Sequence, residues 1–97
     1  MSLKEKIFSD LNSALKSREE NRVLVLKLLK NSIQNKEKEI HQELKDEEVI
    51  KVLLSESKQR KDSMEQFKKG NRDDLVAKEA KELEFIENYL PEMKSEE

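Results

Sequence analysis

Cysteine and tryptophan are absent from this 97-residue chain, and glycine and proline occur once each. Without cysteine, the chain can form no disulfide and offers no thiolate as nucleophile or metal ligand, which fits a reducing compartment. Histidine is represented only by His41, so no pair of imidazoles can build a metal site. We therefore expect no bound metal, and we interpret His41 as an ordinary residue on a helix surface.

Long hydrophobic runs are also missing. No stretch approaches the roughly 18 apolar residues that a membrane-spanning helix needs, and the amino terminus has no apolar stretch of signal-peptide length. We expect no membrane contact and a cytoplasmic location, with an organelle matrix as the alternative.

Charged residues make up 43% of the chain and hydrophobic residues only 34%, so the core must be thin. The formal net charge is nevertheless only −2, and the apolar residues recur with helical periodicity, which is not typical of disordered chains. These features predict a folded, all-α domain over residues 1–91. Residues 92–97 read as the start of a truncated or missing carboxy-terminal helical domain.

The periodicity predicts four helices. Ser2 and Glu5 have the spacing of a capping box, which opens a first helix that reaches about Lys16. Ser17 and Glu20 repeat this spacing and predict a long second helix from Arg18 to about Leu44, with its first half as the central helix of the domain.

The second pair of helices is expected to form an antiparallel hairpin. Asp46 is suited to cap a third helix that ends near Lys69, where Gly70 can adopt the left-handed conformation that closes a helix. Asn71 opens the fourth helix, which runs through Tyr89 to the proline at position 91.

A charge interrupts the apolar face of the third helix at Arg60. In an antiparallel hairpin, residue 60 lies opposite residues 80 to 82, so Arg60 should meet Glu79 or Glu82. The pair would fix the register of the hairpin, because a partly buried charge needs a partner. A binding site at Arg60 is the alternative.

No catalytic constellation can be recognised. None of the serines lies in a glycine-rich turn or a nucleophile elbow, and the single glycine cannot form a phosphate-binding loop. We assign no catalytic residue and expect no cofactor.

Basic residues suggest a contact with RNA. Residues 51–72 carry a net charge of +4, whereas residues 73–97 carry −6. Acidic residues interleave the basic ones and no aromatic platform accompanies them, so a solvated helix face is the alternative interpretation. The candidate RNA-binding residues are Lys27, Lys30, Lys58, Arg60, Lys61, Lys68, Lys69 and Arg72.

A helical protein-interaction domain is a competing hypothesis. Leu26, Ile33 and Ile40 have heptad spacing, but Lys36 and Glu43 occupy the alternate seam positions, so a sustained coiled coil fails. We expect a monomer or weak self-association.

Several segments of the chain resemble the YqeY family. They are R-V-L-V-L-K-L-L-K-N-S-I-Q-N-K-E-K-E from Arg22, K-Q-R-K-D-S from Lys58, G-x-R-D-x-L from Gly70 and Y-L-P from Tyr89. Essentially the whole chain takes part in the resemblance.

The resemblance implies an all-helical amino-terminal domain related to the tail of the B subunit of tRNA-dependent amidotransferases. That tail contacts tRNA, while the chemistry takes place elsewhere in the enzyme. It also implies the label of a carbon–nitrogen ligase with glutamine as amido-N-donor, and tRNA or an amidotransferase subunit as partner. Because no catalytic residue carries over, we expect an accessory module that is non-catalytic in isolation.

Overall fold

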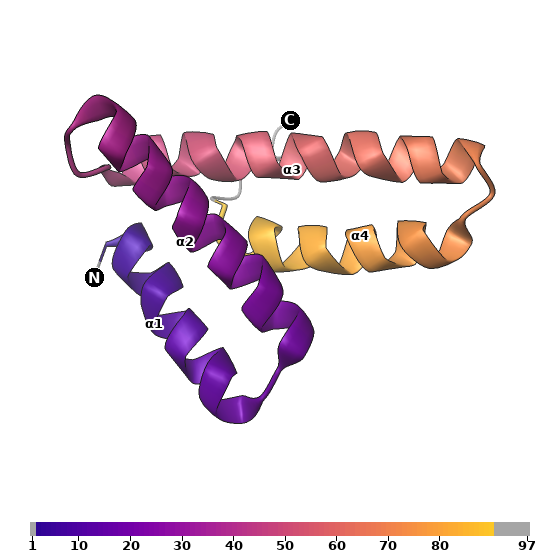
Figure 1. Cartoon of the computed structure of the whole chain (residues 1–97), viewed down its shortest axis with the longest axis horizontal. Coiled ribbons are helices and arrows are strands. Elements are labelled where there is room, and N and C mark those ends of the chain that lie inside the picture. Colours follow the sequence, from indigo (N-terminus) through magenta and orange to yellow (C-terminus); the bar gives the residue numbers. More distant parts are fainter. Residues whose placement is uncertain (1, 91–97) are drawn as a thin grey trace. The chain divides into compact units, whose positions relative to one another are not determined.

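The computed structural model describes residues 2–90 and contains four helices, with no strand among these residues. The helices are α1 (Leu3–Ser17), α2 (Glu20–Ile40), α3 (Asp46–Lys69) and α4 (Asp73–Glu87). The prediction of an all-α fold with a hairpin of the third and fourth helices is confirmed (Figure 1). The chain divides into two compact units, with the boundary between Val52 and Leu53.

The first unit is built on the pairing of α1 with α2, which lie side by side (Figure 1). The predicted capping box is present: the Ser2 hydroxyl accepts from the Glu5 backbone N–H, and the Glu5 carboxylate accepts from the Ser2 backbone N–H. Apolar residues spaced three and four apart supply the core. The fully or nearly fully buried ones are Ile7, Leu11, Ala14, Val25, Leu26, Leu29, Ile33, Leu44 and Val49.

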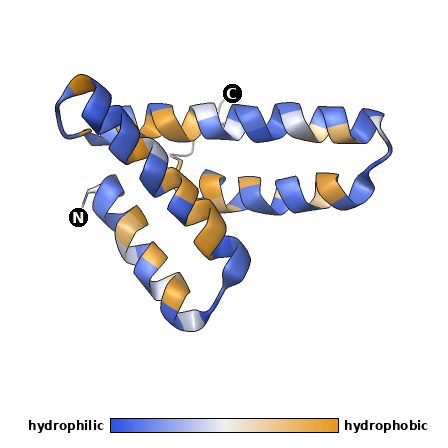
Figure 2. Cartoon of the chain, in the orientation of Figure 1, coloured by the Kyte–Doolittle hydropathy of each residue, from blue (hydrophilic) through white to orange (hydrophobic). Residues whose placement is uncertain are grey.

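The hydrophobic first half of α2 is only partly buried. Leu24 and Leu28 are exposed, although Val25, Leu26 and Leu29 between and beside them are buried. Figure 2 shows the hydrophobic colour concentrated in this half of α2. The expectation of a central helix therefore holds for one face of α2 and not for the other.

The second unit contains the α3–α4 hairpin. In Figure 1, α4 runs back beside the second half of α3. Leu53 and Ile86 are fully buried apolar residues of this unit, and Glu56, Ser57 and Arg60 are buried polar ones. Few apolar side chains are thus fully buried here, as the composition implies.

The first three helices end with a non-glycine residue in the left-handed conformation: Arg18, His41 and Asn71. At the end of α3, the Arg72 N–H donates to the Phe67 carbonyl and the Asn71 N–H donates to the Lys68 carbonyl, which is the Schellman pattern. The prediction that Gly70 takes the left-handed position is wrong, because the closing residue is the next one, Asn71.

Predicted boundaries of the last three helices also differ. The fourth helix, α4, runs from Asp73 to Glu87, with Arg72 at its N-cap, and not from Asn71 through Tyr89. Ser17 lies inside α1, and the residue at the N-cap of α2 is Glu19, with no side-chain cap. The helix α2 ends at Ile40 and not at Leu44, because His41 turns the chain. Asp46 is the first residue of α3, and its carboxylate accepts from the backbone N–H of Leu3 at 2.9 Å. A contact distant in sequence has therefore taken the oxygen that we expected to cap α3.

Candidate functional site

The best-defined polar site in the first unit is centred on Glu37. The Glu37 Oε2 atom accepts from Lys4 Nζ at 2.6 Å and from the Leu44 backbone N–H at 3.0 Å. Glu43 lies 3.5 Å from the same ammonium. One carboxylate near the end of α2 thus holds the start of α1 and the loop that leads to α3. We call Lys4, Glu37, Glu43 and the Leu44 N–H the Glu37 cluster.

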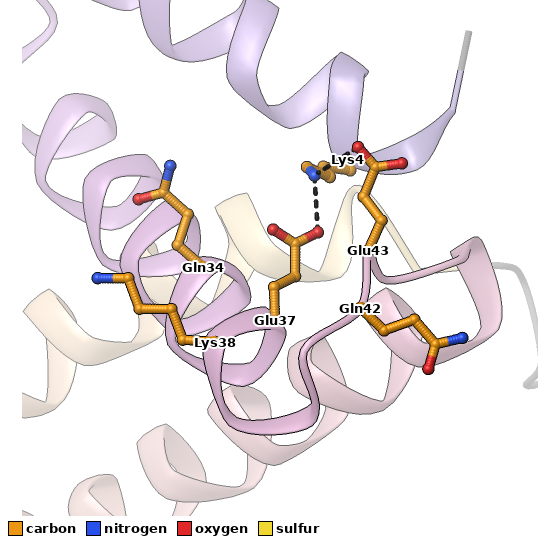
Figure 3. A pocket seen from close by; sticks show the side chains of 6 residues that line it. All are labelled: Lys4, Gln34, Glu37, Lys38, Gln42 and Glu43. Atoms are coloured by element: carbon orange, nitrogen blue, oxygen red, sulfur yellow. Dashed lines mark hydrogen bonds and ion pairs between the residues drawn. The ribbon is translucent and has the colours of Figure 1, made fainter.

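A shallow hollow of about 530 Å³ lies beside this cluster. Figure 3 shows the side chains around it, with Glu37 reaching toward Lys4 and with Gln34 and Lys38 neighbouring each other on α2. The lining residues are Lys4, Gln34, Glu37, Lys38, Gln42 and Glu43. The lining is polar and carries both signs of charge, so the hollow suits a polar or charged group.

Electrostatics in the cluster favour the charged forms of both partners. The hydrogen bond from Lys4, followed by that from the Leu44 N–H, lowers the pKa of Glu37 below its ordinary value. The hydrogen bond to Glu37 raises the pKa of Lys4 above its ordinary value, although partial burial opposes this shift. Both side chains are less than a fifth exposed, at 17% for Lys4 and 18% for Glu37, so solvent screens the pair only in part.

Phe8 lies beside the cluster and interacts with two lysines. Lys30 Nζ is 5.3 Å and Lys4 Nζ is 5.8 Å from the centre of its ring. Both distances are within the range of cation–π attraction. Lys4 is hydrogen-bonded to Glu37, whereas the Phe8 ring is the principal interaction partner of Lys30.

In the second unit, Arg60 sits in a buried charge cluster. Its Nη1 donates to Glu56 Oε1 at 3.1 Å, and its Nε lies 3.7 Å from Glu82 Oε1. Of the two acids named from the sequence, Glu82 is therefore the one beside Arg60; Glu79 has no ion pair with it in the structure. The Arg60 side chain is only 10% exposed, which leaves it little access to an RNA phosphate.

The other candidate RNA-binding residues of this unit divide into two groups. Lys61 lies 3.8 Å from Glu87, and Arg72 makes two 3.3 Å hydrogen bonds to Asp74, which lower the pKa of Asp74. Lys58, Lys68 and Lys69 are exposed and have no carboxylate within ion-pair distance in the described part of the chain. We call these three residues the hairpin lysines.

The two candidates of the first unit lie on α2. Lys27 is exposed and Lys30 is half-buried over Phe8. Sequence reasoning missed the Glu37 cluster altogether, because it depends on contacts between residues 33 positions apart. The capping box of Ser2 and Glu5 was the only local sequence signal near this cluster, because the box fixes the start of α1, where Lys4 lies.

No helix in the described part of the chain is long and apolar enough to cross a membrane. Over residues 2–90, no three His, Asp or Glu side chains are grouped so that they could hold a metal ion.

The fold and these sites define an all-α protein whose two helical units each contain a network of ion pairs. Residues 4–97 match the family model described as Yqey-like protein. The chain belongs to this family, as the resemblance in its sequence indicated.

Curated relatives extend over most of the chain. A protein of Lachancea thermotolerans named "Altered inheritance of mitochondria protein 41, mitochondrial" is 39% identical over 85 residues, which are 87% of this chain and 46% of that protein. Its namesake in Kluyveromyces lactis is 37% identical over 82% of this chain and 44% of that protein. An uncharacterized protein of Schizosaccharomyces pombe is 33% identical over 84% of this chain and 67% of its own length. The chain thus spans about half the length of the first two relatives.

Proposed function

We propose that this chain is a non-catalytic helical module that contacts tRNA in support of a tRNA-dependent amidotransferase or a related enzyme. The observation that carries the proposal is which basic residues of the α3–α4 hairpin have a carboxylate within ion-pair distance and which do not. Arg60, Lys61 and Arg72 have carboxylates beside them, whereas the hairpin lysines have none among the described residues. Lysines without an acidic neighbour are available for phosphate oxygens.

The distribution of charge sets the orientation of this contact. Residues 51–72, which include the hairpin lysines, carry a net charge of +4, and residues 73–97 carry −6. RNA should therefore approach the α3 side of the hairpin and avoid α4, whose acids repel phosphate. Because the contact is made by a few lysines without aromatic stacking, the affinity should be modest and sensitive to salt.

The link to amidotransferases rests on the family resemblance. The names of the relatives mention mitochondria and no reaction, so they supply no substrate. In this proposal the carbon–nitrogen ligase chemistry belongs to the partner enzyme. The cytoplasm is our proposed compartment, and the word "mitochondrial" in the relatives' names makes an organelle matrix the alternative.

Fluorescence anisotropy with labelled deacylated tRNA tests the proposal. The wild-type chain should bind at low salt and release the tRNA at moderate salt, and the variant K58A/K68A/K69A should lose most of this binding. Lys61→Ala is the matched control, because Lys61 lies on the same helix with Glu87 beside it. Equal binding by the triple variant and the wild type would refute the hairpin as the contact.

A helical protein-interaction domain without an RNA role is the second candidate. It is favoured by Leu24 and Leu28, which lie one helical turn apart on α2 and are 55% and 43% exposed. Leu15, in the last turn of α1, is also exposed. Exposed leucines that gather on one face are typical of a surface that binds a protein.

Light scattering over a range of concentrations examines this second candidate. If two copies pair through α2, the mass should rise with concentration, and L24Q/L28Q should remain monomeric. A mass that stays at 11.5 kDa at all concentrations would exclude pairing of the chain with itself.

A further inference from the structure

The carboxylates that accompany α2 are largely neutralised by neighbouring cations. Glu37 binds Lys4, and Glu39 accepts from Lys36 at 2.9 Å. At the other end of the helix, Glu19 lies 3.5 Å from Arg22. The α2 lysines with no carboxylate in ion-pair distance, in the part of the chain that the structure describes, are Lys27, Lys30 and Lys38. We call these the α2 lysine row.

The spacing of the row places its members along one flank of α2. Steps of three and four residues lead from Lys27 to Lys30, from Lys30 to Gln34 and from Gln34 to Lys38, and such steps keep side chains on neighbouring positions of a helix surface. The distance along the axis is about 16 Å at 1.5 Å per residue. Gln34 and Lys38 border the hollow beside the Glu37 cluster, and Figure 3 shows them next to each other. The amide of Gln34 adds a neutral hydrogen-bond donor to the row.

Phe8 restrains one member of the row. The Lys30 ammonium lies 5.3 Å from the centre of the ring, so part of the freedom of this long side chain is already lost before a ligand arrives. Ordering a lysine on binding costs conformational entropy, and a side chain that is held in advance loses less.

We propose that the α2 lysine row is a second contact for an RNA phosphate backbone, and that Phe8 is a positioning residue for Lys30. This inference rests on the proposed function, that the chain binds tRNA, but it concerns a different surface from the hairpin lysines. Each lysine contacts one phosphate at a time, so the row accounts for up to three phosphates.

The salt dependence of tRNA binding tests the row. The logarithm of the binding constant falls with the logarithm of the salt concentration by about 0.7 to 0.9 for each phosphate that a cation neutralises. Loss of two contacts in K30A/K38A should therefore reduce the slope by about 1.5 and weaken binding by at least about threefold at low salt. The matched control is K6A/K36A, which removes the same charge from lysines that lie against Asp10 and Glu39.

The variant K58A/K68A/K69A, measured in the same series, separates this inference from the proposed function. If the salt dependence of tRNA binding is unchanged in K30A/K38A but reduced in the hairpin variant, the contact at the α2 lysine row is refuted and the hairpin contact stands. A slope reduced in K30A/K38A but unchanged in the hairpin variant overturns the hairpin contact and supports the row. If K30A/K38A and K6A/K36A reduce tRNA affinity and its salt dependence equally, the effect comes from net charge in general. That result would overturn the α2 lysine row as a specific contact.

A double-mutant cycle tests Phe8. The variant F8L should weaken tRNA binding in the wild-type background and have no further effect in the K30A background, since its effect passes through Lys30. A merely structural role predicts the same loss in both backgrounds, and that result would overturn the positioning role.

Discussion

Lys4 Nζ lies 2.6 Å from Glu37 Oε2, so a charged hydrogen bond ties the first turn of α1 to the last turn of α2. The same carboxylate oxygen accepts from the Leu44 backbone N–H and fixes the loop before α3. Glu37 therefore joins three parts of the first unit, which are the start of α1, the end of α2 and the loop before α3.

Glu37→Gln tests this dependence. The amide keeps the shape and can still accept from the Leu44 N–H, but the charge is lost, so we expect the free energy of unfolding to fall by about 1 to 2 kcal/mol. Urea denaturation measures the change. As a control, Glu39→Gln removes a carboxylate whose partner, Lys36, is exposed like Glu39 itself, and should cost no more than about 0.5 kcal/mol. Equal effects of the two substitutions would contradict the role of Glu37.

The pair should also make stability depend on pH. The pKa of Glu37 is lowered on folding, so its contribution is complete above the ordinary carboxyl value of 4.5 and disappears as the pH falls through the folded-state pKa. The pKa of Lys4 is raised, so its contribution is complete below the ordinary value of 10.5 and disappears as the pH rises through the higher folded-state pKa. The stability difference between the wild type and E37Q should be constant between these limits and shrink below about pH 4. A difference that persists unchanged at pH 2 would rule out this linkage.

Arg60 and Lys61 are adjacent in sequence but should respond very differently to substitution. Arg60→Ala leaves the buried Glu56 and the partly buried Glu82 without their guanidinium, and should cost about 3 to 5 kcal/mol. Lys61→Ala removes an exposed ion pair with Glu87 at 3.8 Å and should cost less than about 1 kcal/mol. Thermal or urea unfolding of the two variants provides the comparison. A cost for R60A as small as that for K61A would show that the buried pair does not stabilise the hairpin.

The single glycine should be replaceable. Gly70 does not have a positive φ, and a Cβ there would lie at ordinary contact distances of 3.8 to 3.9 Å from its neighbours. Gly70→Ala should therefore stabilise the chain by about 0.4 to 1 kcal/mol, because the unfolded chain loses freedom. Asn71→Ala should destabilise it, since Asn71 has a φ of 60° and alanine tolerates the left-handed region less well. Circular dichroism melts of both variants decide the matter, and the reverse order of stabilities would refute the geometry of this turn.

Local pattern was sufficient to predict the four helices within residues 2–90. Apolar residues such as Ile7, Leu11 and Ala14 recur at helical spacing and are buried in the structure. The capping box of Ser2 and Glu5 was predicted for the same reason, since both partners lie within one turn.

Features decided by distant contacts or by backbone strain were not predictable in this way. Asp46 accepts from Leu3, 43 residues away, and so does not act as a local cap. His41 adopts the left-handed conformation, which is uncommon for any non-glycine residue, and this ends α2 earlier than the pattern implies. Of the candidate site residues, the sequence identified the lysines but not which of them have carboxylates beside them, because ion pairs such as Lys4 with Glu37 form across elements.

The first measurement to make is an amide NMR spectrum of the ¹⁵N-labelled chain, recorded with and without deacylated tRNA at low salt. If the chain contacts tRNA through the hairpin, the signals of Lys58, Lys68, Lys69 and their neighbours should shift on addition of tRNA, and added salt should reverse the shifts. A spectrum in which these signals remain unchanged at saturating tRNA would contradict the proposed function.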